Sequence, residues 1–297
     1  MINKVKKGEK KIYFKSPLNY IGGKYKLLGQ IIPKIPNDIN VFFDLFAGGC
    51  NVAVNIPSKQ LVLNDNIRYL IDLYKFFYEQ DYDSILNHIE SRIEEFQLSK
   101  TNENGYKELR RFYNQNRNPL DLFVLVAFSF NHQIRYNKKH EFNNPFGRDR
   151  SSFNPTMKNN LENFVTRLKE KKTHFLSQDF DQIDYSFLGK QDFVYCDPPY
   201  LITTGTYNDG KRGFTGWSTK EETNLYKILN NLNSRGVRFA LSNVLEHKGL
   251  ENTILMNWLS SNGYYIHHLN KDYSNSNYQL KDKKKNNSSE VLITNYS

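Results

Sequence analysis

The sequence contains few cysteines and no long apolar stretch. Of its 297 residues, two are cysteines, Cys50 and Cys196, and no apolar run is long enough to cross a bilayer or to form the core of a secretory signal. Structural disulfides belong to oxidising compartments, which secreted chains reach through such a signal. We therefore expect free thiols, no membrane association and a cytoplasmic location.

Two phosphate-binding patterns are also missing. Gly22-Gly23-Lys24 looks like the end of a Walker loop, but Tyr25 follows where serine or threonine is required, and the first glycine of that motif is absent. The glycines at 48–49 depart from the fingerprint that binds the pyrophosphate of dinucleotides. A nucleotide phosphate is therefore disfavoured as the ligand.

Acidic residues are outnumbered by basic ones. The chain has 41 Lys and Arg against 31 Asp and Glu, a net charge of +10. Such an excess indicates a polyanionic partner whose affinity falls as salt rises, with solubility as the alternative explanation. We expect residues 1–10 to be a mobile basic arm, either touching that partner or simply solvated, and residues 281–287 to be a mobile basic loop.

Over much of the chain, short apolar runs alternate with segments whose apolar residues have helical spacing. The run at 41–46 breaks into the glycine turn, after which a helix should follow, and the run at 60–63 precedes helically spaced apolar residues. Further strands are expected at 173–176, 193–196 and 237–243, with a closing antiparallel pair at 264–269 and 291–294. This alternation predicts an α/β fold with a mostly parallel sheet and right-handed crossovers.

The alternation stops between residues 81 and 171. Charged helical stretches, the apolar run at 120–130 and a polar segment at 131–155 take its place. The chain is long enough for one domain with a large insertion or for two domains. We interpret 81–171 as an inserted, mainly helical module that interrupts a domain formed by 11–80 and 172–297.

Asp197-Pro198-Pro199-Tyr200 follows the run at 193–196, where a buried parallel strand would end. The prolines fix the backbone and remove two donors, so the Asp197 carboxylate and the Pro198 carbonyl can accept from an amino group on a flat heterocycle. The Tyr200 ring can stack on that heterocycle. Open α/β sheets bind ligands at this edge, although an ordinary strand end is the alternative interpretation.

Acidic residues also follow the first two predicted strands. Asp44 is placed to meet a cationic amino group, and Asp65 to accept from ribose hydroxyls, with the glycine turn at 48–49 allowing close approach. A ligand with adenosine and amino-acid halves and no phosphate would use all three features. For Asp65 the alternative is a helix N-cap.

Six motifs occur in an order that resembles the DNA adenine-N6 methyltransferases of the Dam type, the D12 class, over residues 16–296. The sequence departs from the family pattern at Asn19, Tyr20 and Cys50, which stand where the family has Lys, Trp and Gly. The matching stretches are Asn19-Tyr20-Ile21-Gly22-Gly23-Lys24, Phe46-Ala47-Gly48-Gly49-Cys50, Asn64-Asp65, Phe142-Asn143-Asn144-Pro145-Phe146-Gly147, Asp179-Phe180 and Asp197-Pro198-Pro199-Tyr200.

The resemblance implies a Rossmann-like methyltransferase fold in which the inserted module at 81–171 recognises the target. It implies S-adenosylmethionine as cofactor, no metal, and transfer to N6 of an adenine flipped out of duplex DNA. The catalytic residues would be Asp197, Pro198 and Tyr200. The cofactor-binding residues would be Tyr20, Gly22, Lys24, Asp44, Phe46, Gly48, Asp65, Asp179, Phe180 and Asp197.

DNA recognition is expected in the inserted module. Its cations would contact phosphates and a guanine, with a turn at Asn144-Pro145 and a solvated cationic face as the alternatives. The candidate residues are Arg135, Lys138, Lys139, Asn144, Pro145, Arg148 and Arg150. We expect the modification enzyme of a restriction-modification system in a prokaryotic cell, with the endonuclease on a separate chain, or a stand-alone marker of the chromosome. The enzyme should be a monomer or weak dimer.

Two other functions fit parts of the pattern. Methyltransferases acting on RNA or on protein glutamine also carry a Pro-Pro-Tyr clamp, but theirs usually begins with Asn and follows the cofactor turn more closely. The other alternative is a DNA-binding relative without activity, against which the intact motif at 197–200 argues.

Overall fold

The computed structural model describes residues 12–203, 216–270 and 288–297. The basic arm predicted at 1–10 and the basic loop predicted at 281–287 lie outside the described residues. Within the described ranges, no helix combines the length and the apolar character that a membrane span requires.

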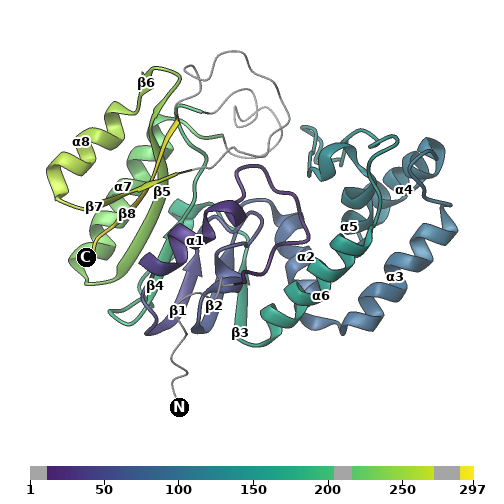
Figure 1. Ribbon diagram of the computed structural model, residues 1–297, viewed down its shortest axis with the longest axis horizontal. Coiled ribbons are helices and arrows are strands. Elements are labelled where there is room, and N and C mark those ends of the chain that lie inside the picture. Colours follow the sequence, from purple (N-terminus) through teal and green to yellow (C-terminus); the bar gives the residue numbers. More distant parts are fainter. Residues whose placement is uncertain (1–11, 204–215, 271–287) are drawn as a thin grey trace.

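An eight-stranded sheet forms the centre of the described chain (Figure 1). The strands lie in the order β3-β2-β1-β4-β5-β8-β7, and β6 pairs with β5. The first five are mutually parallel, whereas β8 is antiparallel to both β5 and β7. This confirms the mostly parallel sheet and the closing antiparallel pair. The strands are β1 (Ile39–Asp44), β2 (Ser58–Asn64), β3 (Lys172–Leu176), β4 (Phe193–Cys196), β5 (Arg238–His247), β6 (Leu250–Glu251), β7 (Tyr265–Leu269) and β8 (Ser288–Thr294).

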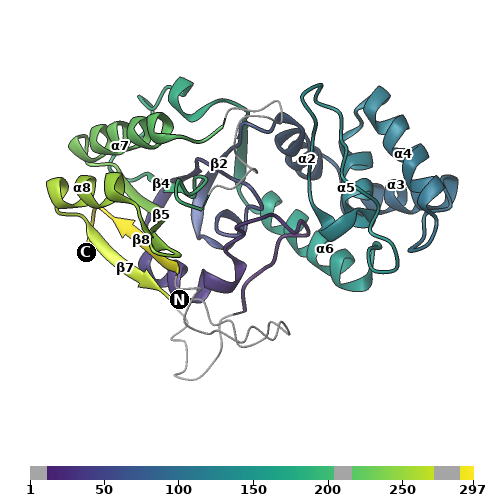
Figure 2. The ribbon, with the colours of Figure 1, turned by 90° about the horizontal axis from the view of Figure 1, so that it is seen from above.

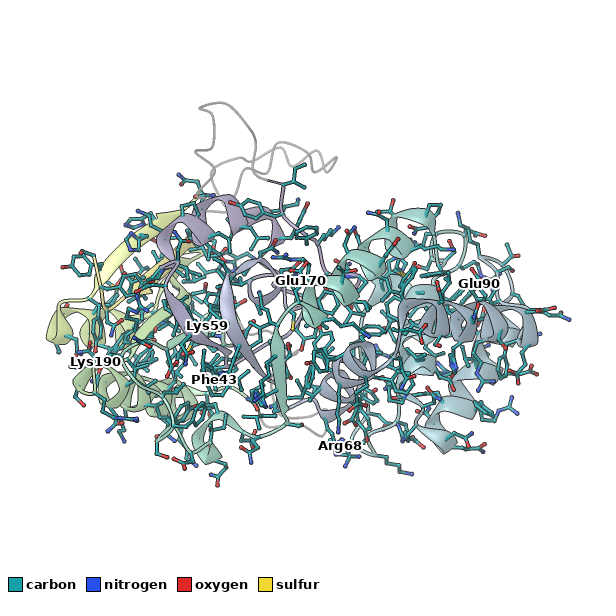
Figure 3. The ribbon with its side chains drawn as sticks, turned by 90° about the horizontal axis from the view of Figure 1, so that it is seen from below. Phe43, Lys59, Arg68, Glu90, Glu170 and Lys190 are labelled. Atoms are coloured by element: carbon teal, nitrogen blue, oxygen red, sulfur yellow. The ribbon has the colours of Figure 1, made fainter. Side chains whose placement is uncertain are left out.

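The central strands read as continuous apolar runs because both faces of the sheet are covered. Successive side chains of a strand point to opposite faces. Phe42 accordingly belongs to one apolar cluster, stacked 5.6 Å from Phe193. Phe43, which is labelled in Figure 3, belongs to the other cluster.

Different helices cover the two faces. The Phe42 side is covered by a short N-terminal helical segment, η1 (Tyr25–Leu27), α1 (Leu28–Ile31) and η2 (Ile32–Lys34), together with α2 (Arg68–Glu79). The Phe43 side is covered by η5 (Phe180–Gln182), α7 (Thr219–Ser234) and α8 (Thr253–Asn262). A Ser218–Glu221 capping box starts α7.

The prediction of a helix directly after the glycine turn is wrong. Only the three-residue 3₁₀ turn η3 (Ala53–Asn55) lies there before β2. The connection uses its first residues for the turn and reaches Pro57 just before β2, so no length remains for a full crossover helix. The N-terminal helical segment and α6 (Pro155–Lys169) cover that part of the core instead.

The chain between α2 and β3 is helical. It contains α3 (Tyr82–Glu95), α4 (Glu103–Asn116), α5 (Pro119–Phe128), η4 (Phe130–His132) and α6. Figures 1 and 2 show α3, α4 and α5 grouped at the end of the molecule away from α7 and α8. The buried helix α5 packs against α2, α3 and α4, and the apolar core continues from the sheet into it. The division into domains at 81 and 171 stays a prediction.

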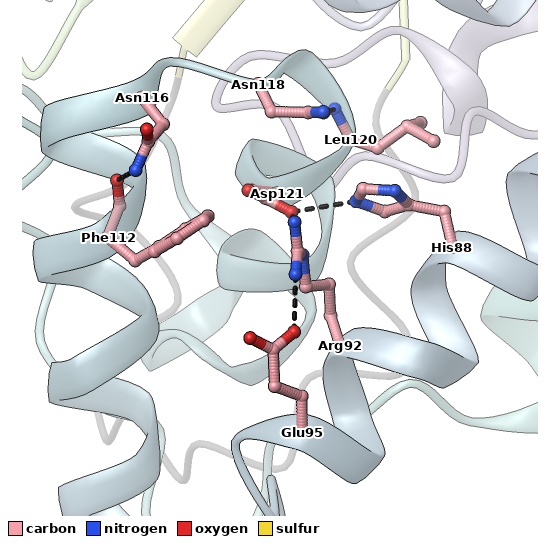
Figure 4. A network of polar contacts seen from close by, with 8 residues as sticks. All are labelled: His88, Arg92, Glu95, Phe112, Asn116, Asn118, Leu120 and Asp121. Atoms are coloured by element: carbon pink, nitrogen blue, oxygen red, sulfur yellow. Dashed lines mark hydrogen bonds and ion pairs between the residues drawn. The ribbon is translucent and has the colours of Figure 1, made fainter.

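A charged network ties α3 to α5 (Figure 4). Asp121, on the first turn of α5, is fully buried, and its Oδ1 accepts from Arg92 Nε at 2.9 Å and lies 2.8 Å from His88 Nε2. Arg92 also pairs with Glu95. Each helix therefore contributes a charge that would be costly to bury without the other.

Candidate active site

A cavity of about 540 Å³ opens at the carboxyl ends of β1, β2 and β4. The strand order reverses between β1 and β4, which is where open α/β sheets bind ligands, and the volume is that of a small-molecule site. The structure brings together residues far apart in the sequence. The predicted residues that line the cavity are Tyr20, Gly22, Lys24, Phe46, Gly48, Asp65, Asp179, Phe180, Asp197, Pro198 and Tyr200.

The glycine turn after β1 requires glycine at Gly48. This residue has φ +45°, and a Cβ there would lie 3.1 Å from the Tyr20 ring. Cys50, the departure from the family glycine, also has positive φ, +54°, and is buried. The turn thus holds a side chain in a conformation that favours glycine, and Tyr20 packs directly on it.

Asp65 pins the turn to the end of β2. Its Oδ2 accepts from the Gly48 amide at 3.0 Å, and its Oδ1 from the Ile67 amide at 2.9 Å. The N-cap residue of α2 is Ile67, so Asp65 is not the N-cap of that helix. Burial raises the pKa of Asp65 to about 6, while the two amides oppose the rise. A carboxylate is thereby held at the cavity wall.

Asp44 lies beneath the turn, at a smaller cavity of about 60 Å³ that shares Tyr20 and Asp197 with the large one. It is 2 % exposed, and within the described residues its Oδ1 has no hydrogen-bond partner. Burial, and then the charges of Asp197 and Asp65, raise its pKa well above the ordinary value. An unpartnered buried carboxylate oxygen is costly, so the pocket fits a cationic group.

Three aromatic rings form one wall of the large cavity. The centroids of Phe46 and Phe180 are 5.6 Å apart, and Trp217 lies 5.5 Å from the first and 5.4 Å from the second. Trp217 was not predicted because it belongs to none of the motifs. Its Nε1 donates to the buried Glu222 at 2.6 Å, which fixes the ring. The only signal in the sequence is a rare residue type, one of two tryptophans, within a polar stretch.

The predicted catalytic residues meet a buried ion pair. Lys24 Nζ lies 2.7 Å from Asp197 Oδ1, and the Tyr200 hydroxyl donates toward the same oxygen at 3.2 Å. The Tyr200 hydroxyl is also 3.0 Å from Oε1 of Glu290, a buried residue of β8 that sequence reasoning missed. In the described part of the chain, no donor lies on the Pro198 carbonyl. The corner therefore presents acceptors, as the motif predicts.

The electrostatics of this corner follow from burial. Burial raises the pKa of Asp197, and the nearby Lys24 ammonium opposes the rise. Burial, followed by the charges of Asp197 and Glu290, raises the pKa of Tyr200 well above its ordinary value. Tyr200 thus stays a neutral phenol and a hydrogen-bond donor.

Residues 134–136, within the predicted module, contribute to the same cavity. Arg135, predicted to bind DNA, lines it together with Ile134 and Tyr136. Arg135 Nε donates to Asn143 Oδ1 and its Nη2 to the Asn143 carbonyl, both at 2.9 Å. These bonds hold the guanidinium at the cavity wall.

The other predicted DNA-binding residues divide by exposure. Asn144 is buried, and its amide donates to the carbonyls of Phe130 and Gln133, which supports the alternative of a structural turn residue. Arg148 pairs with Glu103 at the surface. The exposed candidates are Lys138, Lys139, Pro145, Arg148 and Arg150. Contact of any of these with DNA stays a prediction.

No group of three or more His, Cys, Asp or Glu among the described residues is arranged to hold a metal ion.

Comparisons with known proteins agree with the motifs. The family model for D12 class N6 adenine-specific DNA methyltransferases matches residues 20–289. The chain is 50 % identical to the type II methyltransferase M.FokI of Planomicrobium okeanokoites over 285 residues, which is 96 % of this chain and 43 % of that protein. It is 49 % identical to the modification methylase StsI of Streptococcus sanguinis, covering 99 % of this chain and 45 % of that one.

This chain matches most of the length of a shorter relative. The type II methyltransferase M.MjaIII of Methanocaldococcus jannaschii is 30 % identical over 76 % of this chain and 83 % of its own length. The chain thus spans less than half the length of M.FokI and StsI but most of M.MjaIII. On its motifs, its site and the family match, the chain belongs to the D12 class of N6 adenine-specific DNA methyltransferases.

Proposed function

We propose that this chain transfers a methyl group from S-adenosylmethionine to N6 of an adenine flipped out of duplex DNA. The observation that carries the proposal is the meeting, in one cavity, of Asp197, Pro198 and Tyr200 with the predicted cofactor residues. The family match and the +10 charge support the same substrate.

The donor set fits this cofactor. The buried Asp44 oxygen without a partner suits the α-amino group of a methionine moiety, and the Asp65 carboxylate suits ribose hydroxyls. The wall of Phe46, Phe180 and Trp217 suits a flat purine. Because Gly48 has no side chain, the backbone of the turn can lie close to the ligand.

The cofactor, when bound, supplies a methyl group on a sulfonium, which needs no further activation. The chain must then raise the nucleophilicity of an amino nitrogen whose lone pair is delocalised. Asp197 and the Pro198 carbonyl accept its two N–H groups and favour the pyramidal nitrogen. Positive charge develops on this nitrogen only as its bond to the methyl carbon forms and the carbon–sulfur bond breaks, so these acceptors stabilise the transition state more than the bound substrate. The thioether S-adenosylhomocysteine would be the leaving group, and the surplus proton of the methylated amine would pass to Asp197 or to water.

Flipping the adenine costs a few kcal/mol, and stacking on Tyr200 returns about 1–3 kcal/mol. The positive charge of Lys24, 2.7 Å from Asp197, keeps the Asp197 carboxylate ionised, so that it can accept from the adenine amino group. The cations of the insert, with Arg135 at the cavity mouth, would follow the DNA backbone.

Radioactive methyl transfer tests the proposal. Purified full chain is incubated with tritiated S-adenosylmethionine and with duplex DNA, RNA or protein, and the modified base is identified by mass spectrometry. We expect label in duplex DNA as N6-methyladenine, lost by at least about 10²–10³-fold in Asp197→Ala with DNA affinity unchanged. The control is Asp184→Ala, an exposed carboxylate outside the cavity.

Label only in RNA or protein, or full activity of a folded Asp197→Ala variant, would refute the proposal. Tyr200→Ala should reduce the rate. An unchanged rate together with an unchanged 2-aminopurine flipping signal would count against stacking.

We further propose that the enzyme is the modification partner in a restriction-modification system in the cytoplasm of a prokaryotic cell, with the endonuclease on a separate chain. M.FokI and M.MjaIII are type II methyltransferases and StsI is a modification methylase, which supports this context. Long-read sequencing of DNA from cells that express the chain would identify the modified adenine site, GATC or another. Sedimentation would test the expected monomer or weak dimer.

A further inference from the structure

Glu290 is a buried carboxylate that belongs to none of the motifs. It lies on β8, opposite Val244 of β5 and Leu269 of β7, and is 3 % exposed. Burying a carboxylate in the middle of a sheet is costly unless it is paired. An apolar side chain would fill this position without that cost, so its contacts merit a functional explanation.

The contacts of Glu290 lead to the catalytic corner. Its Oε1 accepts from the Tyr200 hydroxyl at 3.0 Å and lies 3.6 Å from Lys24 Nζ. The same hydroxyl and the same ammonium also contact Asp197 Oδ1, at 3.2 and 2.7 Å. One cation is therefore shared by two carboxylates, and one phenol lies between them.

This arrangement restricts the Tyr200 ring. The ring cannot turn away without losing the contact of its hydroxyl with Glu290. Lys24 Nζ lies over one face of the ring, 5.0 Å from its centroid, so a stacked base would have to use the opposite face. Within the described residues, both side-chain contacts of Asp197 are made by Oδ1, so its Oδ2 can turn to an amino group.

We propose that Glu290 is a positioning residue for methyl transfer. It holds the Tyr200 hydroxyl and shares Lys24 with Asp197, so that the stacking face and the accepting oxygen are set before the base enters. The inference rests on the proposed function and adds a residue to that site.

A merely structural role for Glu290 would change stability or the overall rate, but not the way the rate depends on pH. The charge of Glu290 raises the pKa of Asp197, whereas the hydrogen bond from Tyr200 lowers it. If transfer needs ionised Asp197, the acid limb of the rate should move to lower pH in Glu290→Gln and to higher pH in Tyr200→Phe. These opposite shifts distinguish positioning from support of the strand.

The experiment measures single-turnover methyl transfer to duplex DNA from pH 5 to 9. We expect Glu290→Gln to move the acid limb to lower pH, because the charge that raises the pKa of Asp197 is removed. Glu290→Ala should lower the plateau rate about fivefold, the loss expected for one hydrogen bond. Gln should restore most of that loss, since its amide oxygen still accepts from Tyr200. Glu246→Gln, an exposed carboxylate on neighbouring β5, should match the parent.

An acid limb that stays at the parent pH in Glu290→Gln, or that moves the same way in Glu290→Gln and Tyr200→Phe, overturns the inference. If Glu290→Ala fails to fold by circular dichroism, the opposite shifts of the other two variants still decide it. A parent chain that methylates no adenine in duplex DNA refutes the proposed function itself, whereas an active parent with unshifted variants refutes the role of Glu290 alone.

Discussion

Replacing Lys24 by methionine tests whether charge holds the catalytic corner together. Lys24 is 4 % exposed, and its Nζ lies 2.7 Å from Asp197 and 3.6 Å from Glu290. Removing one member of a buried ion pair costs about 3–5 kcal/mol, because the remaining charge is left buried without a partner. We expect Lys24→Met to lower the free energy of unfolding by about this amount at pH 8.

The deficit should shrink as the pH falls. Lys24 opposes the rise that burial causes in the pKa of Asp197, so its loss raises that pKa further. A carboxyl whose folded pKa exceeds the unfolded value stabilises the folded state at low pH, and this contribution is lost as the pH rises through the folded pKa. Between the folded pKa of Asp197 in the parent and its higher folded pKa in the variant, the deficit should decrease by about 1.4 kcal/mol for each pH unit lowered.

Urea unfolding followed by tryptophan fluorescence at pH 5 and pH 8 measures the effect. Lys26→Met is the matched control, since Lys26 is exposed two residues away and should change stability by less than about 0.5 kcal/mol. A deficit of equal size at both pH values would refute the argument, and so would a deficit no larger than that of the control.

Three further predictions concern the cofactor, the insert and DNA. Because burial raises the pKa of Asp65 to about 6, calorimetry should find that affinity for S-adenosylhomocysteine is constant above pH 7 and weakens by up to about tenfold per unit below pH 6. Affinity independent of pH from 5 to 7 would contradict this. Asp121→Ala should lower the free energy of unfolding by about 1.5–3 kcal/mol, the loss expected for hydrogen bonds between charged groups, and Asp121→Asn by less, whereas a normal urea midpoint in both would show that the network adds no stability. Arg135→Ala and Arg148→Ala should weaken duplex binding in anisotropy titrations, with a smaller salt dependence for Arg148→Ala; parent-like binding of specific and random duplexes by both would remove them from the interface.

The sequence alone predicted the sheet, and most of the catalytic and cofactor residues that it predicted line the cavity. Apolar runs such as 193–196 become buried parallel strands because both of their faces are covered. The prolines of 198–199 and the glycine at Gly48 act on their own backbone, so their consequences are visible locally. The prediction of a helix after the glycine turn was wrong. The segment that connects β1 to β2 is too short for a crossover helix, whatever the helix propensity of its residues.

Tertiary structure decided which distant residues share the site. Glu290 reaches Tyr200 only because β8 inserts between β5 and β7, and neither residue has a neighbour in the sequence that signals this pairing. Trp217, just before α7, joins Phe46 and Phe180, and Arg135 lines the cavity although it lies far from the strands in the sequence. The sequence pattern of a segment determines its helices, strands and turns, because these depend on residues that are neighbours along the chain. Buried ion pairs and clusters of aromatic rings depend on the order of the strands in the sheet, which no single segment of the sequence encodes.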